Sequence, residues 1–535
     1  MNKRNSIINF VVVVAILVIA NLISLNVFHR FDFSKDKVFT LSNSSKTIVG
    51  SLDDNLIVKA YFSKDLPNQY ADLRRYVRDI LSDYQTYSKG HLKYDFINPS
   101  DEEMLKQEAY KNKIQPAQIK ILENDKMEVR EVYMGIYVEY QGNGESIPLI
   151  QVKDGLENDI TGIIKRLTRA QMDKVALFID PEAEETDFKS IEYLLGKNYE
   201  MVPVDLMSPI EMGVKNLVLT GEKDSLHIEQ LYNLDQYVMN GGNLLVFQDR
   251  VTMDVQSSTG EEIHSNLFDL LAHWKINIAP TLVVDENCGQ ISVSQRQGPF
   301  ITQIPVKYPL IPVVNNMSKE NPIVKKLENL ILLGASDLDV VMDSTSTVNF
   351  RPLFTSSNRS GSLKGPRFGI SFQTFQGGKL NAMVKEPFKI LAGLYEGSFD
   401  SFFTFSEQAG RPDFRKNVEG GQIIVVTDSD FVNDKGAGKQ PNNLNFVLNA
   451  SDYLVGDLSA LEIRSRSISM SRLDVRQWLL RDGRDPVDLD GEEKRVKLIA
   501  KSLNIVLPAL LMIIAGFIYV TIRRKKSEKI RRMYE

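Results

Sequence analysis

The chain has 535 residues, of which 43% are hydrophobic and 25% are charged, and this composition is typical of a folded protein rather than a disordered one. Its formal net charge of -5 argues against nucleic acid as the main partner, because nucleic-acid-binding surfaces are basic. The single cysteine, Cys288, excludes an internal disulfide, so the fold must be stabilised by its apolar core.

Two apolar stretches stand near the ends of the chain, at residues 7–27 and 502–522. Each is long enough for a helix that crosses a bilayer. Basic residues flank both stretches on the terminal side, namely Lys3, Arg4, Arg523, Arg524, Lys525, Lys526, Lys529, Arg531 and Arg532. The positive-inside rule therefore predicts a two-pass protein of the cell inner membrane, with both termini cytoplasmic and the bulk of the chain periplasmic. The alternative for the first stretch is a cleaved signal peptide, although its apolar run is longer than such peptides usually have.

Three polar side chains fall within these apolar stretches: Asn21 and Ser24 in the first, and Asn504 in the second. An unpaired polar group in lipid is costly, so we expect intramembrane hydrogen bonds to one another or to the helices of a partner. The alternative is that all three lie at interfacial depth, in contact with water.

The first part of the region between the two stretches alternates between strand and helix patterns. Strands are predicted at 56–63, 92–97, 117–122 and 132–140, and helices at 70–87 and 101–113. The order β-α-β-α-β-β is that of a thioredoxin-like domain, which we predict over residues 30–155. A working oxidoreductase carries Cys-x-x-Cys where the first strand meets its helix, but residues 63–66 read SKDL. Redox catalysis is therefore excluded, and a binding or scaffolding unit is expected.

A connecting helix at 156–172 leads to a clearer alternation of strands and helices over residues 173–460. Strands are predicted at 175–180, 201–205, 216–220, 243–249 and 421–430, and helices at 189–195, 225–239 and 443–455. The pattern predicts the α/β fold class, with a larger doubly wound, flavodoxin/Rossmann-like domain around a mostly parallel sheet. The remaining predicted segments are a transmembrane helix at 1–29, a β-rich insertion at about 252–417, a polar return segment at 461–498, a second transmembrane helix at 499–523 and a basic cytoplasmic tail at 524–535.

Four aspartates fall where strands of the second domain are predicted to end: Asp180, Asp249, Asp428 and Asp430. Ligands usually bind at the carboxyl ends of parallel strands in open α/β folds. Clustered carboxylates can hold a cation or act as general acid and base. The alternative is that these residues form turns and cap helices, as aspartate commonly does where a strand leads into a helix.

The usual motifs of catalysis are missing from the sequence. Lys379 in QGGKL and Lys439 in GAGKQ lack the upstream glycine and the following Ser or Thr of a nucleotide-binding loop. The five histidines never form His-x-His or His-Glu-x-x-His, and no Gly-x-Ser-x-Gly occurs. Cys288 has no histidine beside it in sequence. We therefore predict that the chain is not an enzyme and uses no cofactor or metal.

Five segments together carry a family resemblance: RFDFSKDKVFTLSNSSKTI, DGLENDITGIIKRLTR, LDQYVMNGGNLLVFQD, IIVVTDSDF and NFVLNASDYLVGD. They are similar to the auxiliary subunit of an ABC transporter of gliding bacteria, the gliding-associated substrate-binding component G, over nearly the whole chain. The resemblance implies an ABC-2-type permease and a separate cytoplasmic ABC ATPase as partners, and a role in gliding motility and its secretion system. It also implies an α/β domain like that of intraflagellar-transport proteins, which act as interaction modules.

Two functional hypotheses follow. The first is a non-catalytic auxiliary subunit of an ABC transporter complex, whose extracytoplasmic body binds a partner, cargo or substrate, such as a periplasmic protein or polymer, and couples it to the permease and ATPase. The alternative is a membrane-anchored periplasmic enzyme, or a metal-dependent ligand binder, that uses the four carboxylates at the strand ends.

Overall fold

The computed structural model divides the chain into two compact units, residues 1–469 and residues 470–535. In the first unit it describes residues 40–467, apart from 124–125, 170, 182, 185, 222, 255, 298–299 and 341–346. In the second unit it describes residues 495, 496, 498, 499, 502, 516 and 519–521, all of them helical.

The membrane-spanning part of the predicted fold class needs correction. Within the described residues, no helix is both long enough and apolar enough to cross a membrane. The helices and strands that these residues form make a mixed α/β fold. The 20-residue helix α3 (Asn68–Tyr87), for example, packs one apolar stripe on a sheet and is polar elsewhere. The predicted stretch 7–27 and most of 502–522 lie outside the described residues, as do Asn21, Ser24 and Asn504.

The first sheet has four strands in the order β2-β1-β5-β6. Their bounds are β1 (Leu56–Phe62), β2 (Leu92–Ile97), β5 (Met134–Tyr140) and β6 (Asn143–Ile147). β1 and β2 are parallel and are joined by α3, whereas β5 is antiparallel to both β1 and β6. A separate hairpin is formed by β3 (Ala117–Glu123) and β4 (Lys126–Val132).

The sequence analysis missed β4 and β6. β4 alternates charged with apolar residues, and β6 begins directly after the tight turn at Gly142, so both resemble exposed loop. The thioredoxin-like assignment and the boundaries of the predicted domains stay predictions.

Helices cover this sheet and complete its apolar core. They are α2 (Asn43–Gly50), α3, α4 (Glu103–Lys111), the short η1 (Pro99–Asp101) and α5 (Leu156–Thr168). α5 buries Leu156, Ile160, Ile163 and Ile164, which recur at the spacing of one helix face. The helix predicted to connect two domains therefore belongs to the first core through its apolar face.

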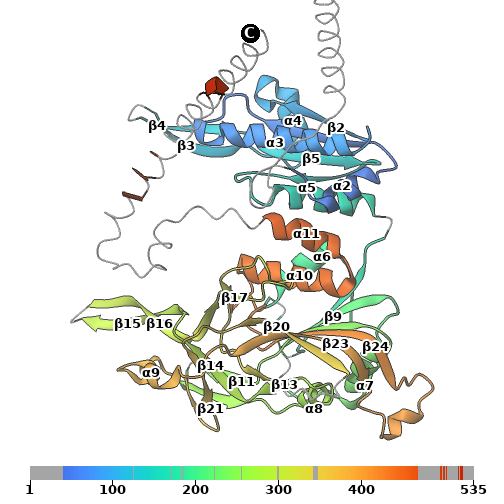
Figure 1. Ribbon diagram of the computed structural model, residues 1–535, viewed down its shortest axis with the longest axis vertical. Coiled ribbons are helices and arrows are strands. Elements are labelled where there is room, and N and C mark those ends of the chain that lie inside the picture. Colours follow the sequence, from blue (N-terminus) through green and yellow to red (C-terminus); the bar gives the residue numbers. More distant parts are fainter. Residues whose placement is uncertain are drawn as a thin grey trace, which may run out of the picture. The chain divides into compact units, whose positions relative to one another are not determined.

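The second sheet has eight strands in the order β17-β20-β23-β24-β10-β9-β7-β8 (Figure 1). Five of them are parallel to one another: β7 (Lys174–Ile179), β8 (Glu200–Val202), β9 (Val214–Thr220), β10 (Asn243–Phe247) and β24 (Asn417–Val426). Three antiparallel strands extend it: β17 (Asn316–Met317), β20 (Val348–Thr355) and β23 (Ile390–Asp400). These three come from the segment predicted as an insertion, so the sheet is mixed, with parallel strands in the majority.

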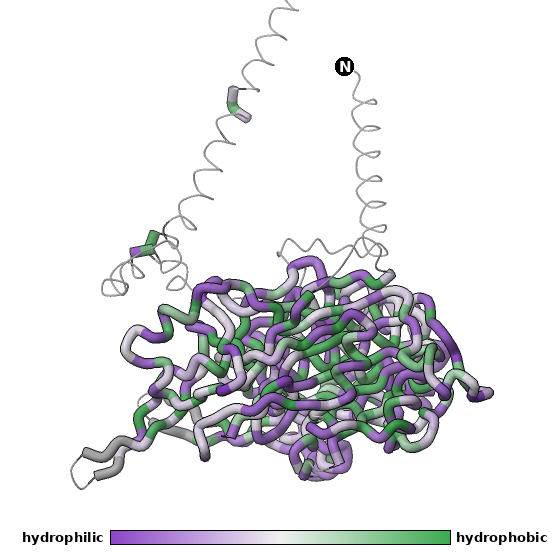
Figure 2. Tube along the Cα trace, turned by 90° about the horizontal axis from the view of Figure 1, so that it is seen from below, coloured by the Kyte–Doolittle hydropathy of each residue, from purple (hydrophilic) through white to green (hydrophobic). Residues whose placement is uncertain are grey.

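The eight-stranded sheet has an apolar core on each face. α6 (Lys189–Asn198) and α10 (Pro441–Val455) cover one face, and α7 (Ile228–Met239) and α8 (Asn266–His273) cover the other (Figure 1). The last described helix of this unit, α11 (Leu458–Ser467), packs against α2, α5 and α10. Hydrophobic positions gather in the interior of the described body, as Figure 2 shows.

Small sheets pack at the carboxyl edge of the parallel strands around a core of their own, which includes Val251, Leu282, Tyr308 and Phe368. The strands are β11 (Val251–Asp254), β12 (Thr259–Glu262), β13 (Asn277–Ala279), β14 (Thr281–Asp285), β15 (Cys288–Gln297), β16 (Phe300–Val314), β18 (Leu330–Ile331), β19 (Asp337–Asp339), β21 (Ser360–Lys364) and β22 (Phe368–Gly369). Two short helical turns accompany them, η2 (Phe372–Phe375) and α9 (Lys379–Met383), whereas η3 (Glu407–Gly410) follows β23 and leads to Arg411, which contacts α7.

We expect Phe431→Ala to lower the free energy of unfolding by about 3–5 kcal/mol, the usual cost of emptying an aromatic site in a core. Phe431 is fully buried, and its ring lies 5.7 Å from that of Phe247 and 5.4 Å from that of Phe446. Urea unfolding measures the change. The control is Phe405→Ala, which removes a fully exposed ring and should change stability by less than about 0.5 kcal/mol. Equal losses in the two variants would contradict this view of the core.

Candidate functional site

The structure brings together three of the four predicted aspartates. Asp249 and Asp428 each lie two residues beyond the end of a strand, β10 and β24, and these strands are parallel neighbours with Phe247 opposite Val426. The Gln248 N–H continues the pairing by donating to the Val426 carbonyl at 3.0 Å. Asp430 follows two residues later. The parallel register therefore gathers three carboxyl groups at one sheet edge.

Asp180 lies elsewhere on this edge. It follows β7, and β9 separates β7 from β10 in the sheet. Its backbone N–H donates to the Thr220 carbonyl at the end of β9, at 3.3 Å, and its own carbonyl accepts from Ala183 at 2.9 Å. The fourth aspartate thus closes the turn after β7.

Hydrogen bonds hold two of the gathered carboxyl groups. The Ser429 N–H donates to Asp249 Oδ1 at 2.8 Å, and the Ser429 hydroxyl donates to Asp249 Oδ2. The Leu333 N–H donates to Asp428 Oδ2 at 2.6 Å. Asp428 is fully buried, and its Oδ1 atom has no hydrogen-bond partner among the described residues. A buried acceptor left without a donor costs free energy, so this atom marks a strained point of the site.

Burial and mutual repulsion raise the pKa values of all three groups. Burial, and then the charge of Asp430, raises the pKa of Asp249 to about 7. The pKa of Asp428 is raised well above its usual range by burial and by the charges of Asp249 and Asp430. Burial also raises the pKa of Asp430, while the positive charge of Lys223 opposes the shift. Close carboxyl groups in a poorly solvated place cannot all ionise, so the cluster retains protons near neutral pH.

A cavity of about 740 Å³ adjoins this cluster, and we call it the carboxyl-edge cavity. Its lining residues are Asp249, Val251, Met253, Ser258, Ile291, Ser292, Tyr308, Ile311, Leu333, Ile370, Ser371, Phe372, Asp430 and Lys435. The lining therefore combines two carboxyl groups and one lysine with three serine hydroxyls and a set of apolar side chains that includes two aromatic rings. The volume is in the usual range of small-molecule sites.

The arrangement bears on the two alternatives raised by the sequence. Asp249 and Asp428 accept from residues 180 and 95 positions away, so these contacts are tertiary and not local turns or helix caps. In the part of the chain that the structure describes, no group of three or more His, Cys, Asp or Glu side chains is arranged to hold a metal ion. What the described geometry offers is a proton-holding carboxyl cluster beside a ligand-sized cavity.

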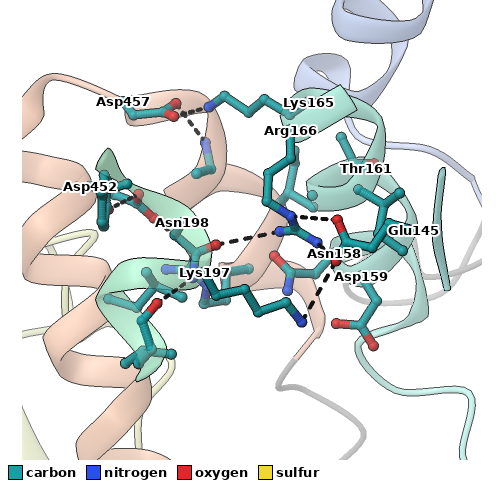
Figure 3. A pocket seen from close by; sticks show the side chains of 18 of the residues that line it. Glu145, Asn158, Asp159, Thr161, Lys165, Arg166, Lys197, Asn198, Asp452 and Asp457 are labelled. Atoms are coloured by element: carbon teal, nitrogen blue, oxygen red, sulfur yellow. Dashed lines mark hydrogen bonds and ion pairs between the residues drawn. The ribbon is translucent and has the colours of Figure 1, made fainter. Parts of the chain in front are cut away.

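A second cavity, of about 350 Å³, is bordered by β6, α5, α6, α10 and α11, and we call it the charged cavity (Figure 3). Arg166 of α5 binds both oxygens of Glu145 on β6, at 2.9 and 2.5 Å, and also reaches Asn198 of α6 at 3.4 Å. Lys197 of α6 points toward Glu145, with 3.9 Å between Nζ and Oε1. These contacts join the first sheet to a helix that covers the second.

Another set of ion pairs lies on the α10–α11 side of the charged cavity. Asp457 accepts hydrogen bonds from both Lys165 and Arg169. Burial, and then the charge of Arg169, lowers the pKa of Lys165 to about 8. Nearby, Arg464 of α11 donates to Asp452 of α10 at 2.9 Å, with both side chains buried.

The sequence analysis missed the charged cavity because its residues come from distant segments and each of them resembles a solvated charge by itself. A signal was present in α5, where Lys165, Arg166 and Arg169 stand on one face opposite the apolar stripe. A basic face on a helix that lies between two sheets is a candidate for buried ion pairs.

The fold and the carboxyl-edge cavity define a mixed α/β protein with a ligand-sized site at the ends of its parallel strands. Comparison with known families places it further: the family described as "ABC-type uncharacterized transport system" matches residues 172–453, and the chain belongs to this family. That match includes every residue that lines the carboxyl-edge cavity. A domain of unknown function matches residues 35–139.

One relative is an uncharacterized protein of Borreliella burgdorferi, 25% identical over 477 residues, which cover 87% of this chain and 90% of that protein. Among solved structures, the N-terminal domain of mmIFT52 is similar with a TM-score of 0.31 and 12% identity, over 52% of this chain and 96% of that one. A ThuA-like protein from Parabacteroides merdae is similar with a TM-score of 0.26 and 11% identity, over 54% of this chain and 91% of that one.

We expect Asp249→Asn to flatten the fall in stability that the wild-type chain shows as pH rises. The pKa of Asp249 in the folded state, about 7, exceeds its ordinary value of 3.8, so the folded state holds this proton more tightly than the unfolded state. The stability that protonated Asp249 contributes is therefore fully present below about pH 4 and is lost as pH rises toward 7. Urea unfolding at pH 5 and pH 8 should show the variant gaining about 1–3 kcal/mol on the wild type between these values.

The control for this experiment is Asp53→Asn, an exposed carboxyl group near the first sheet. Its stability relative to the wild type should not change between the two pH values. If Asp249→Asn behaves in the same way, the carboxyl cluster does not hold protons in the folded state.

We expect Asp457→Asn to destabilise the fold by about 1–3 kcal/mol, because Lys165 and Arg169 would then lie together without their shared counter-charge. Their side chains are about one-fifth exposed, which places the expected loss below that of a fully buried pair. Urea unfolding measures the loss. Glu184→Gln is the matched control, since it removes one of two acceptors of the exposed Lys435 and should cost less than about 1 kcal/mol. A loss for Asp457→Asn no larger than that of the control would contradict the role given to the charged cavity.

Proposed function

We propose that this chain is a non-catalytic auxiliary subunit of an ABC transporter complex. In this proposal it binds a partner, cargo or substrate and couples it to an ABC-2-type permease and a separate cytoplasmic ABC ATPase. The observation that carries the proposal is the family match to an ABC-type transport system over residues 172–453. The full sequence has no nucleotide-binding loop, so the ATP must be hydrolysed by another chain.

The geometry supports a binding role in two ways. The carboxyl-edge cavity offers a ligand a volume of about 740 Å³ whose lining includes both carboxyl groups and apolar side chains. The charged cavity joins the polar face of α5 to α6, α10 and α11 through ion pairs and hydrogen bonds. A displacement of one of these helices would therefore alter its contacts with the others. A subunit that responds to a ligand needs both features.

The site of action belongs to the same proposal. The permease lies in the cell inner membrane, so the auxiliary subunit acts there in complex with it. A role in gliding motility and the associated secretion follows from the resemblance of the five sequence segments to component G of gliding bacteria.

The carboxyl cluster favours one competing function, an enzyme that uses Asp249, Asp428 and Asp430 for acid and base chemistry, since protons held near neutral pH suit that work. The two functions differ in what Asp428→Asn with Asp430→Asn would do. An enzyme would lose turnover in the double variant, whereas an auxiliary subunit would still assemble with its partners.

The proposal predicts that affinity purification of the tagged chain from membranes in mild detergent recovers a polytopic permease and an ATPase with a nucleotide-binding loop. The eluate should hydrolyse ATP, and the isolated chain should not. Mass spectrometry and a phosphate-release assay measure both outcomes. The matched control replaces the nucleotide-loop lysine of the recovered ATPase, which should abolish hydrolysis and leave assembly intact. A chain that purifies without transporter components would overturn the proposal.

A further inference from the structure

The carboxyl-edge cavity has an uncompensated negative side. Asp249 and Asp430 both line it, and among its described lining residues Lys435 is the one cation. Lys435 already binds Glu184 at 2.9 Å and Asp187 at 3.0 Å, so its charge is used outside the pair of carboxyl groups. When both carboxyl groups are ionised, the cavity therefore presents more negative than positive charge to a ligand.

The third carboxyl group of the cluster, that of Asp428, does not line the cavity but interacts with the two carboxyl groups that do. Asp428 is fully buried, its charge interacts with those of Asp249 and Asp430, and its Oδ1 atom has no hydrogen-bond partner among the described residues. Burying a carboxyl oxygen without a donor is costly unless a proton or a cation compensates it. The cluster is thus set up to gain stability when positive charge arrives beside it.

The apolar wall of the cavity is suited to the body of an organic molecule rather than to a bare ion. This wall is the apolar part of the lining, from β11, the β15–β16 hairpin and the start of η2, with Tyr308 and Phe372 as its aromatic members. The Tyr308 hydroxyl donates to the Ile370 carbonyl at 2.5 Å, which fixes this ring in the wall. Aromatic faces attract cations as well as apolar groups.

From these observations we propose that the carboxyl-edge cavity binds a small organic cation, a protonated amine or a guanidinium group carried on an apolar body. The cationic group lies against Asp249 and Asp430, and the apolar body lies against the wall that contains Phe372. A neutral ligand of the same shape leaves the two carboxyl groups without a partner, and an anion is repelled by them. The assignment rests on the proposed auxiliary role for its place in transport, whereas the binding itself is a property of the chain alone.

Binding of the cation favours the ionised carboxyl groups, so protons leave the cluster when the ligand enters. Affinity therefore rises with pH across the range in which the cluster titrates. The charged groups that face the cluster are Lys223, whose charge lowers the pKa values of Asp249 and Asp430, and Asp187, whose charge raises that of Asp430. Once Asp249 and Asp430 are ionised, Lys223 weakens cation binding by repulsion, so its removal should strengthen binding at the upper end of this pH range.

Isothermal titration of the purified full chain tests the proposal, with phenethylammonium and benzylguanidinium as probes and 2-phenylethanol as the neutral isostere. At pH 8 the cations should bind at least tenfold more tightly than the alcohol, and their affinity should fall at least threefold at pH 6. Asp430→Asn should weaken cation binding at least tenfold, and Lys223→Gln should strengthen it. Asp53→Asn, which changes a carboxyl group outside the cavity, should leave binding unchanged.

Phe372→Ala is a second variant that tests the site even if Asp430→Asn does not fold. It should weaken the binding of both cations and of the alcohol, because it removes part of the apolar wall. The thermal unfolding midpoint of each variant reports whether the fold is kept. The proposal is overturned if neither cation binds with a Kd below about 10 mM. It is also overturned if the alcohol binds as tightly as the cations do, or if a folded Asp430→Asn variant binds the cations with unchanged affinity. Failure to bind these probes leaves the copurification result standing, so the two proposals fail separately.

Discussion

The parallel pairing of β10 with β24 is the contact on which the eight-stranded sheet and its two cores depend. It brings together segments that are far apart in the chain, since Asp249 and Ser429, which are hydrogen-bonded beyond the strand ends, are separated by 180 positions. At this pairing the parallel strands also meet the antiparallel extension through β23. β10 and residues 423–426 of β24 are apolar and buried on both faces, so they support the core under α6 and α10 as well as the core under α7 and α8. Closing so long a loop costs chain entropy, which the burial on both faces offsets.

The same pairing places carboxyl groups where water is scarce. In a strand every second side chain lies on the same face, so Asp249 follows Phe247 and Asp428 follows Val426 onto the face of the α6–α10 core. The fold therefore holds three carboxyl groups together at a cost in stability, with Ser429 and the backbone of Leu333 supplying part of the compensation. Structures hold such unfavourable clusters mainly where binding or chemistry uses them.

The sequence predicted much of this region, and the reason is local. The buried parallel strands β7, β9, β10 and β24 are continuous apolar runs, which can be recognised without knowing their neighbours. The rule that ligands bind at the carboxyl ends of such strands then singled out four aspartates, of which the register gathers Asp249, Asp428 and Asp430. Asp180 could not be separated from them in advance, because only the strand order puts β9 between β7 and β10. Strand order also explains why β20 and β23 were assigned to an insertion, since their membership of the sheet depends on partners far along the chain.

The α6–α10 core lies between the carboxyl cluster and the charged cavity, and this gives a ligand at one cavity a physical route to the other. Phe431 follows Asp430 directly, and its ring lies 5.4 Å from that of Phe446 on α10. Further along α10, Asp452 accepts hydrogen bonds from Tyr199 and from Arg464 of α11, and it lines the charged cavity. A densely packed core transmits a displacement instead of absorbing it, so a cation that draws the carboxyl groups together would shift Phe431 against α10. Coupling of this kind requires that α10 or α11 have two arrangements of similar free energy. The partly exposed ion pairs of the charged cavity are suited to supply these two arrangements. Partly exposed charges can exchange partners at a small cost in free energy, whereas close-packed apolar side chains cannot.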